Sequence, residues 1–549
     1  MASPAAAGPR PEPRAGRRAA AIAIALVAPN LVWIALDRSP FGGDAAQYAT
    51  ATMELFAKLL ASPGDWPRAM LAVMPYKAPG LEWFGQLFLP LAFPLGEVGR
   101  PLLLAIAAAG IAGLALLWAA LAELSRSRGA ALAGSLTVAG APLFVTYGNV
   151  LMVEMLQIVA AAWFVAIAAF APRWPRALVL AQLAAAAAFA ALAKTTTLVF
   201  VVFPALVALA SAVRRGEPWS RGLRDRATRL ALAAAILLGA AALLFYLRNW
   251  PSLFNYFRAG AGSSVWGKVD TPLATAAYWL AAIGRHAITP WGLSGLAALA
   301  LFACAPRLAR RTATSPHFRR CALAAAAQMV TMIALFSLSS NRMPRFMAPI
   351  LPLFAVVVAW AVASLGSRIA RGAAIAALSA QFVVVHASSF GMVEAYRDAI
   401  RPLDRAGTRS GLLTAIVDAT CDGSGRAPVT IIAIDAAFRG DWLAPASATY
   451  LATERRFLGK TAADCRYDYL GRRFFGLKSG SWESLTKSDV GFVVATDPAI
   501  HPPLAKTFNF GLNPERYPEV WERLSTSELF ARVGPVGGEP GIVLFRRRS

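Results

Sequence analysis

Charged residues are scarce in this sequence, and acidic residues are the scarcer kind. Only 15% of the 549 residues are charged, 57% are hydrophobic, and the mean hydropathy is +0.52. This balance excludes a chain built only of one or two soluble domains. We find no internal repeat, no heptad pattern and no low-complexity segment beyond Ala-rich stretches, which suit close helix packing in lipid. Most of the chain is therefore expected to lie in a membrane.

Long apolar runs recur along the chain. A helix needs roughly 20 apolar residues to cross about 30 Å of hydrocarbon, and eleven runs approach this length: 19–36, 101–122, 129–147, 155–171, 177–193, 195–213, 229–247, 287–305, 321–339, 346–365 and 372–390. They predict an α-helical polytopic membrane protein with about eleven transmembrane helices. The first run could be a signal peptide, but no clean small-x-small cleavage site precedes Asp37, so a retained anchor is favoured.

The basic residues indicate how the chain is oriented. A net charge of +24, from 54 basic and 30 acidic residues, would suggest a nucleic-acid partner in a soluble protein. Here the basic residues gather in every second connection, as the positive-inside rule predicts, so no nucleic-acid partner is expected. We predict a bacterial inner membrane protein with a cytoplasmic N-terminus and an extracytoplasmic C-terminal part. The basic connections are 10–18, 126–128, 173–176, 214–229, 307–320 and 368–371.

The pattern divides the chain into three parts. Residues 1–18 are rich in Pro, Ala and Arg and are expected to be disordered. Residues 19–390 form the transmembrane module, with a long extracytoplasmic loop at 37–100 that contains interfacial helices. Residues 391–549 are predicted to form a soluble extracytoplasmic α/β domain, because turn residues and charges separate short β-type runs. These runs are 429–434, 490–495 and 542–545.

The four cysteines fall into two groups. Cys304 and Cys321 lie at the ends of apolar runs and are interpreted as small apolar residues. Cys421 and Cys465 both lie in the predicted extracytoplasmic domain, where an oxidising compartment permits a disulfide. The sequence alone does not show whether their geometry allows one.

Asp44 is the first candidate for chemistry, a few residues beyond the first apolar run. It follows Gly42 and Gly43, which free the backbone to hold a carboxylate close to a ligand. Tyr48 follows one helical turn later. An aspartate here can act as a general base on an attacking hydroxyl. The alternative, favoured for this residue taken alone, is an N-cap that opens an interfacial helix.

Several cations stand on the side of the membrane where positive charge is disfavoured. Lys77 follows Tyr76 between two prolines and suits a phosphate, although snorkelling to headgroups is an equal alternative. Arg342 and Arg345 begin an outer span and could clamp a phosphate or anchor lipid headgroups. Lys194, between two spans, is a further misplaced positive charge. We predict that these four cations bind a phosphate.

Glu154 supplies a second carboxylate at the mouth of two apolar spans, where it should be paired or functional. Arg258 and His286, in the connection 248–286, are expected to bind substrate together with Tyr48 and Tyr76. Cations would hold an anionic lipid phosphate, and a carboxylate would serve a hydroxyl acceptor. No metal ligands are predicted, no cofactor is required, and a divalent metal is left open.

At these residues the chain resembles the GT-C membrane glycosyltransferases that use polyprenyl-phosphate sugars, in the branch of protein O-mannosyltransferases and lipid A aminoarabinose and galacturonic acid transferases. The motifs shared with this branch cover about residues 20–365. They are Asp44 with Tyr48, Lys77-Ala78-Pro79 in place of Lys-Pro-Pro, Glu154 in the second outer loop, Leu192-Ala193-Lys194 and Arg345-Phe346-Met347-Ala348-Pro349-Ile350-Leu351-Pro352. No motif of this branch matches the tail after residue 391.

The resemblance implies that Asp44 is the base, that Glu154 orients the acceptor or assists the base, and that the cations hold the donor phosphate. The implied reaction is an inverting transfer of a sugar from a polyprenyl-phosphate donor to a hydroxyl of an extracytoplasmic lipid, polysaccharide or protein. A membrane transporter or lipid flippase is the alternative, but such proteins usually show paired repeats and broken helices. A non-catalytic scaffold would leave the cluster of charges without a purpose.

Overall fold

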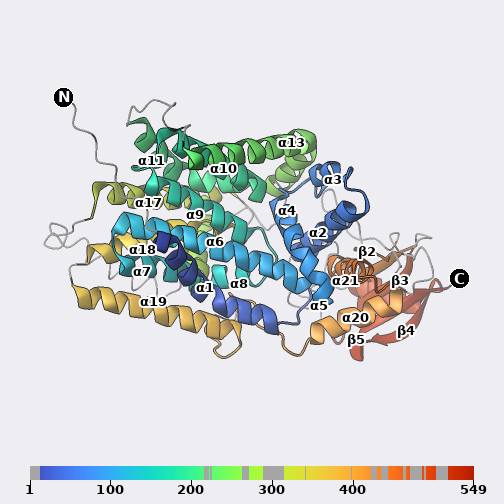
Figure 1. The fold of residues 1–549 in the computed structure, drawn as a ribbon. Coiled ribbons are helices and arrows are strands. Elements are labelled where there is room, and N and C mark those ends of the chain that lie inside the picture. Colours follow the sequence, from blue (N-terminus) through green and yellow to red (C-terminus); the bar gives the residue numbers. More distant parts are fainter. Residues whose placement is uncertain are drawn as a thin grey trace, which may run out of the picture.

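The structure is a computed structural model in which helices dominate and a small sheet lies near the C-terminus (Figure 1). It describes residues 13–548 except 215–221, 223–224, 263–270, 289–313, 340–341, 366, 397, 422–428, 434–442, 462–464, 470–481, 483–484, 487–489 and 502–516. Of the predicted disordered segment, residues 1–12 lie outside this description, and the first helix already begins at Pro13.

Long apolar helices form one bundle. Its members are α1 (Pro13–Leu36), α6 (Gly99–Ser125), α7 (Arg128–Ala139), α8 (Pro142–Gly148), α9 (Glu154–Phe170), α10 (Arg176–Ala193), η2 (Thr195–Val201), α11 (Val202–Val213), α13 (Arg226–Gly262), α17 (Pro316–Phe336), α18 (Ile350–Ser364) and α19 (Arg368–Ser389). Within the described residues, seven helices are long and apolar enough to cross a membrane, or eight with one bent pair; α9 and α18 are shorter. Ten of the eleven predicted runs coincide with these elements, and the run 287–305 lies largely outside the described residues.

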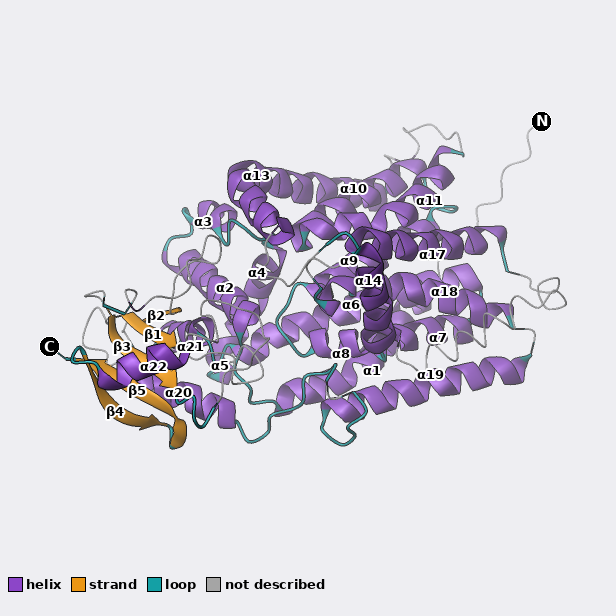
Figure 2. Cartoon of the chain, turned by 180° about the vertical axis from the view of Figure 1, so that it is seen from behind, coloured by secondary structure: helices purple, strands orange, loops and turns teal. Residues whose placement is uncertain are grey.

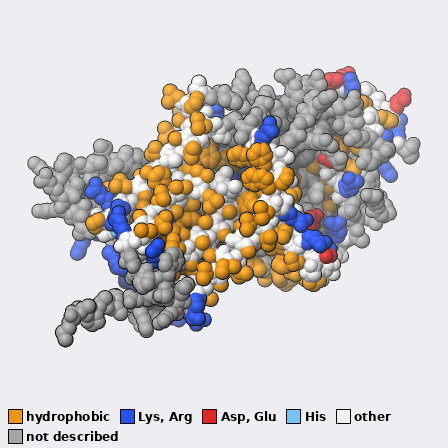
Figure 3. Space-filling view, turned by 90° about the horizontal axis from the view of Figure 1, so that it is seen from above, with side chains coloured by type: hydrophobic (Ala, Val, Ile, Leu, Met, Phe, Trp, Pro, Cys, Tyr) orange, Lys and Arg blue, Asp and Glu red, His pale blue; other side chains and the backbone are white. Residues whose placement is uncertain are grey.

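The surface of the bundle fits a lipid environment. Figure 3 shows a broad hydrophobic face bordered by Lys and Arg side chains. On α13, Leu237 and Leu247 are 71% and 68% exposed, which would be costly in water over so large an area. The chain is a multi-pass membrane protein, as predicted from its hydropathy.

Two of the predicted boundaries are wrong. The run 129–147 is not one straight helix, because α7 ends before Gly140 and α8 restarts at Pro142 with a bend of 64°. Proline lacks the N–H that would continue the first helix, but it is well suited to the first turn of a new one. The connection 248–286 is not a loop: α13 continues through Pro251 to Gly262, and α14 (Pro272–Ala282) and η4 (Ile283–Ile288) follow.

The segment 37–100 forms a cap of short helices, as predicted. These are α2 (Gly43–Ala61), α3 (Trp66–Ala72), α4 (Gly80–Gly85), η1 (Gln86–Leu91) and α5 (Ala92–Leu95). Hydrogen bonds from two tryptophans connect α3 to η1 and α4. The Trp66 indole donates to Gln86 Oε1 at 2.9 Å, and the Trp83 indole donates to the Met70 carbonyl at 3.1 Å. The cap is therefore a packed layer on the bundle.

The C-terminal part is an α/β domain, as predicted. Its elements are α20 (Thr408–Thr420), β1 (Val429–Ala433), α21 (Pro445–Phe457), β2 (Arg466–Tyr469), β3 (Val490–Thr496), α22 (Tyr517–Thr526), β4 (Phe530–Val536) and β5 (Glu539–Arg547). The strand order is β2-β1-β3-β5-β4. β1 is parallel to β2 and β3, while β5 is antiparallel to β3 and β4. The three predicted β-type runs correspond to β1, β3 and β5.

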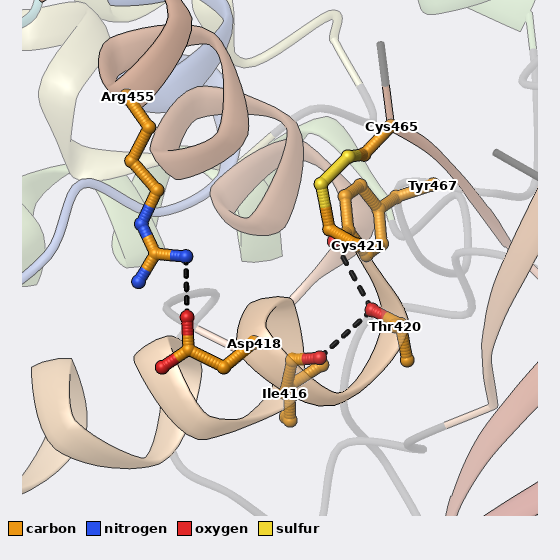
Figure 4. The surroundings of a disulfide bond; sticks show 7 residues. All are labelled: Ile416, Asp418, Thr420, Cys421, Arg455, Cys465 and Tyr467. Carbon is orange, nitrogen blue, oxygen red and sulfur yellow. Dashed lines mark hydrogen bonds and ion pairs between the residues drawn. A yellow bond between two sulfur atoms is a disulfide. The ribbon is translucent and has the colours of Figure 1, made fainter. Parts of the chain in front are cut away.

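A disulfide joins Cys421, directly after α20, to Cys465, directly before β2 (Figure 4). Their Cα atoms lie 5.7 Å apart. Beside it, Arg455 of α21 pairs with Asp418 of α20 at 2.5 Å (Figure 4). The disulfide that the sequence left open is therefore present. Cys321 is a buried free thiol, and Cys304 lies outside the described residues.

The α/β domain docks on the cap through α21 (Figures 1 and 2). The Phe41 and Tyr450 rings lie 5.2 Å apart, and the Phe56 and Phe457 rings lie 6.1 Å apart. Glu454 Oε1 accepts a hydrogen bond from the Val98 amide at 2.6 Å. The domain is thus fixed against α2, the helix that carries Asp44.

Candidate active site

Five ionisable side chains from five separate segments meet at one end of the bundle. Asp44 stands in the first turn of α2, Lys77 before α4, Glu154 at the start of α9, Lys194 directly after α10, and Arg345 in η5 (Pro344–Met347). Salt bridges connect all five side chains. We name them the ion-pair cluster. All five residues were singled out as candidate site residues from the sequence.

Asp44 is held by two cations. Lys77 Nζ donates to Asp44 Oδ1 at 2.7 Å, and Arg345 Nη2 donates to Asp44 Oδ2 at 3.0 Å. Lys77 also reaches Gln47 Oε1 at 3.3 Å. The N-cap of α2 is Gly42 and the cap has no side-chain hydrogen bond, so the N-cap interpretation of Asp44 is wrong. The Lys77 side chain is only 10% exposed, which speaks against snorkelling.

Glu154 is the fully buried member of the ion-pair cluster. Its Oε1 lies 3.2 Å from Lys194 Nζ and 3.8 Å from Arg345 Nε. Its Oε2 has no hydrogen-bond partner among the described residues. Arg345 therefore spans both carboxylates. One oxygen of Glu154 is left as a free acceptor, which in a buried site favours a ligand that brings a donor.

Aromatic rings surround the cations. Lys77 Nζ lies 5.0 Å from the centre of the Tyr48 ring and 5.7 Å from that of Tyr76. Lys194 Nζ lies 4.4 Å from the centre of the Phe346 ring. Tyr256 of α13 packs on Tyr76, with ring centroids 5.6 Å apart. Tyr256 was not predicted from the sequence, because 248–286 was interpreted as a connection between spans. The continuation of α13 through Tyr256 was not expected.

The local backbone explains how the two motifs of the cap come together. Gly43 has φ +48°, a conformation that favours glycine and that turns α2 at its first residue. Gly80 opens α4 against α10: a Cβ built on it would lie 2.6 Å from the Leu192 carbonyl oxygen. The segment that carries Lys77 thus packs directly on the backbone that precedes Lys194.

The electrostatics of the ion-pair cluster keep Asp44 ionised. Burial alone would raise its pKa, but the charges of Lys77 and Arg345 and their hydrogen bonds outweigh burial and lower the pKa. Tyr48 is buried beside Asp44, Glu82 and Glu154, and its pKa is raised well above the ordinary value, first by burial and then by their charge. Asp44 is therefore a carboxylate whose basicity is held down by its two partners.

Three predicted site residues are not members of the ion-pair cluster. The Arg342 guanidinium lies 5.8 Å from the Tyr278 ring and 3.4 Å from Thr275 Oγ1, both on α14. Arg258 is exposed on α13, and His286 is half-buried in η4. Within the described chain, neither Arg258 nor His286 forms a salt bridge or hydrogen bond with the cluster. Their assignment to substrate binding stays a prediction.

No group of three or more His, Cys, Asp or Glu side chains that could hold a metal ion occurs among the described residues.

One buried carboxyl group was not predicted from the sequence. Glu82, in the first turn of α4, is fully buried, and within the described parts of the chain neither of its carboxyl oxygens has a hydrogen-bond partner. The sequence reading missed it, because a single glutamate in an interfacial helix is ordinarily solvated.

No known family and no curated protein matches the sequence. Solved structures of other proteins resemble the fold, and the following are among them. ArnT from Cupriavidus metallidurans, bound to undecaprenyl phosphate, is 17% identical with a TM-score of 0.54. The same protein in the apo state is 15% identical with a TM-score of 0.57; each comparison covers 95% of this chain and 97% of ArnT. Arabinofuranosyltransferase AftD from Mycobacteria is 16% identical with a TM-score of 0.48, over 98% of this chain and 40% of AftD. At such identities the likeness to ArnT shows a shared fold.

Proposed function

We propose that this chain, which has the GT-C fold, is a glycosyltransferase that moves a sugar from a polyprenyl-phosphate donor to a hydroxyl of an extracytoplasmic acceptor. The observation that carries the proposal is the ion-pair cluster, in which two carboxylates and three cations meet at one end of a membrane bundle. The ArnT structure with undecaprenyl phosphate supports a lipid phosphate as the ligand of this fold.

The charges of the cluster suit a phosphodiester. Lys77, Lys194 and Arg345 contribute three positive charges, and Asp44 and Glu154 contribute two negative ones. The surplus of one positive charge matches the single negative charge of a sugar phosphodiester. Arg345 offers a planar guanidinium, which suits phosphate oxygens, while the two lysines act as point charges.

Donor binding would activate the base. As long as Lys77 and Arg345 hold Asp44, its carboxylate is a weak acceptor of protons. A phosphate between the same two cations competes with Asp44 for their hydrogen bonds. Asp44 then gains basicity when the donor arrives, and only then is it suited to take a proton from the acceptor.

The proposed reaction is a displacement at the anomeric carbon of the donor sugar. The acceptor oxygen attacks the anomeric carbon, its proton passes to Asp44, and the bond from the anomeric carbon to the phosphate oxygen breaks. The phosphate keeps the electron pair and leaves as polyprenyl phosphate, stabilised by the three cations. The free Oε2 of Glu154 can accept a hydrogen bond from a hydroxyl and orient it.

The proposal is tested by transfer in membranes, with a panel of labelled polyprenyl-phosphate hexoses and pentoses and an envelope extract as acceptor. The change Asp44→Asn keeps the shape but removes the base, so transfer should fall about 10²- to 10⁴-fold. Asp65→Asn, an exposed carboxylate of the same cap, is the matched control and should stay within twofold of wild type. Full transfer by the Asp44→Asn protein would remove Asp44 from the mechanism. Movement of the intact lipid across the bilayer without bond cleavage would instead favour a flippase.

A further inference from the structure

Glu82 is a buried acid to which the proposed reaction assigns no role. It lies in the first turn of α4, with no exposed surface. Neither carboxyl oxygen has a hydrogen-bond partner among the described residues. A buried carboxyl group without partners costs stability, and such a group in a native structure calls for an explanation.

The surroundings of Glu82 connect it to the ion-pair cluster. Lys77 stands five residues earlier in the same loop, and its charge acts on the Glu82 carboxyl. When it is ionised, Glu82 in turn acts electrostatically on Tyr48 of α2 and on Tyr76. These are the two tyrosines whose rings flank the Lys77 ammonium. The buried Glu82 carboxyl therefore lies within electrostatic reach of the cation that would bind the phosphate.

Three polar side chains of the cap near Glu82 in the sequence or on α2 have partners other than Glu82. Lys77 already donates to Asp44 and Gln47. The Thr52 hydroxyl, on the face of α2 that packs at Gly85, donates to the Tyr48 carbonyl. Gln86, one turn after Glu82, accepts from the Trp66 indole and donates to Met70 Sδ. Each of these polar groups thus has another partner.

Burial also decides the charge of Glu82. It raises the pKa of the carboxyl to about 8, although the backbone amide of Glu82 and the Lys77 charge oppose this. At neutral pH the group is then mainly an uncharged carboxylic acid. In that form it offers one O–H donor and further acceptor oxygens, and it does not repel a phosphate.

We propose that Glu82 is a further substrate-binding residue, whose carboxyl group exchanges hydrogen bonds with a hydroxyl group of the sugar on the lipid donor. This inference rests on the proposed function. The phosphate has three cations in the ion-pair cluster, so it does not need Glu82. The sugar is attached directly to that phosphate, and its hydroxyls both donate and accept, as a carboxylic acid does.

The test compares two ligands in one protein. Purified wild type, Glu82→Gln and Glu82→Leu are titrated with undecaprenyl phosphate, and with the undecaprenyl-phosphate hexose or pentose that wild type binds best. The amide keeps a donor and an acceptor, while leucine keeps the volume and removes both. We expect Glu82→Leu to bind the sugar-bearing lipid about 10-fold more weakly, which corresponds to the loss of about 1.4 kcal/mol, one good hydrogen bond. It should bind undecaprenyl phosphate within twofold of wild type, and Glu82→Gln should stay near wild type for both.

The pH dependence separates binding from a purely structural role. Wild-type affinity for the sugar-bearing lipid should fall as pH rises through about 8, because the carboxyl loses its donor proton. Glu82→Gln should show no such fall. Tyr48 and Tyr76 titrate above their ordinary range and Asp44 below its own, so they do not account for a change between pH 7 and 9. Glu54→Leu, on the exposed face of α2, is the matched control.

Each outcome decides the inference. Unchanged affinity of Glu82→Leu for both lipids, or an equal loss for both, would overturn the assignment to the sugar. Wild type that binds neither lipid would overturn the proposed function itself, and with it the inference. Wild type that binds undecaprenyl phosphate and discriminates by sugar, with Glu82→Leu discriminating equally well, would overturn the inference alone.

Discussion

Gly80 packs against the main chain of Leu192, and no larger residue fits between them. A Cβ at position 80 would lie 2.6 Å from the Leu192 carbonyl oxygen and 2.9 Å from its carbonyl carbon. The neighbour is backbone, so it cannot rotate away as a side chain can. This contact sets the distance between the segment that carries Lys77 and the one that carries Lys194.

Gly80→Ala should therefore weaken lipid binding markedly, although it adds only one methyl group. The added methyl pushes α4 away from α10 and separates the two lysines, so affinity for undecaprenyl phosphate should drop about 10-fold or more, the usual cost of misplacing one charged hydrogen bond. Equilibrium binding to purified protein measures it. Gly64→Ala, in the same cap with nothing within 4 Å of its added Cβ, should bind as wild type. Equal behaviour of the two variants would contradict the packing argument.

Arg345 should tolerate no replacement, not even lysine. Its guanidinium contacts Asp44 and Glu154 at the same time. The single ammonium group of a lysine cannot make both contacts. Arg345→Lys and Arg345→Ala should both weaken undecaprenyl phosphate binding, by roughly 10- to 100-fold, since a hydrogen bond to a charged group is worth about 1.5–3 kcal/mol. Arg342→Ala shows whether a loss of binding is specific to the ion-pair cluster, because Arg342 contacts α14 instead. An Arg345→Lys protein with wild-type affinity would argue against the clamp.

Glu82 makes the stability of the protein depend on pH. An unfolded glutamate loses its proton near pH 4.5, but in the folded protein the proton is kept until about pH 8. The folded state thus binds the extra proton within this window, so stability falls as pH rises, by at most about 1.4 kcal/mol per pH unit. Melting temperatures of wild type and Glu82→Gln in detergent should diverge from pH 5 to pH 8, with the variant the more stable at the upper end. Parallel curves would show that the carboxyl is solvated.

Reduction of the Cys421–Cys465 disulfide should loosen the C-terminal domain and leave the bundle intact. The bond closes a segment of 44 residues that includes α21, and a disulfide over such a span typically contributes about 2–4 kcal/mol. Limited trypsin digestion with and without dithiothreitol should cut the reduced tail several-fold faster. The Cys421→Ser/Cys465→Ser protein should behave as the reduced wild type and ignore dithiothreitol, whereas Cys321→Ser should respond to it normally.

Hydropathy and charge sorting predicted much of this molecule. Lipid requires long apolar helices, so the runs were visible, and Arg345 and Lys194 stood out because positive charge was out of place there. The bend at Pro142 and the continuation of α13 past Pro251 were missed. In the first case a proline restarts a helix within an unbroken apolar run, and in the second a proline is carried inside a helix.

Residues of the site were predictable where their type was unusual for the position, and not where it was ordinary. Asp44 and Lys77 stand beside glycines and prolines, which single them out. Glu82 stands among residues typical of an interfacial helix, and only tertiary packing buries it. The strand β2, Arg466–Tyr469, was missed for a similar reason, since a short polar edge strand has almost no signal in the sequence.

The docking of α21 on α2 means that the tail cannot be treated as an appendage. A protein shortened to residue 390 would lose Tyr450 from Phe41 and Phe457 from Phe56, and would strip the Val98 amide of its only side-chain acceptor among the described residues. The helix α2, which carries Asp44, would then lose its packing contacts with α21. Chimaeras that exchange the tail between proteins of this fold must therefore exchange the matching surface of α2 as well, because the two surfaces pack on each other.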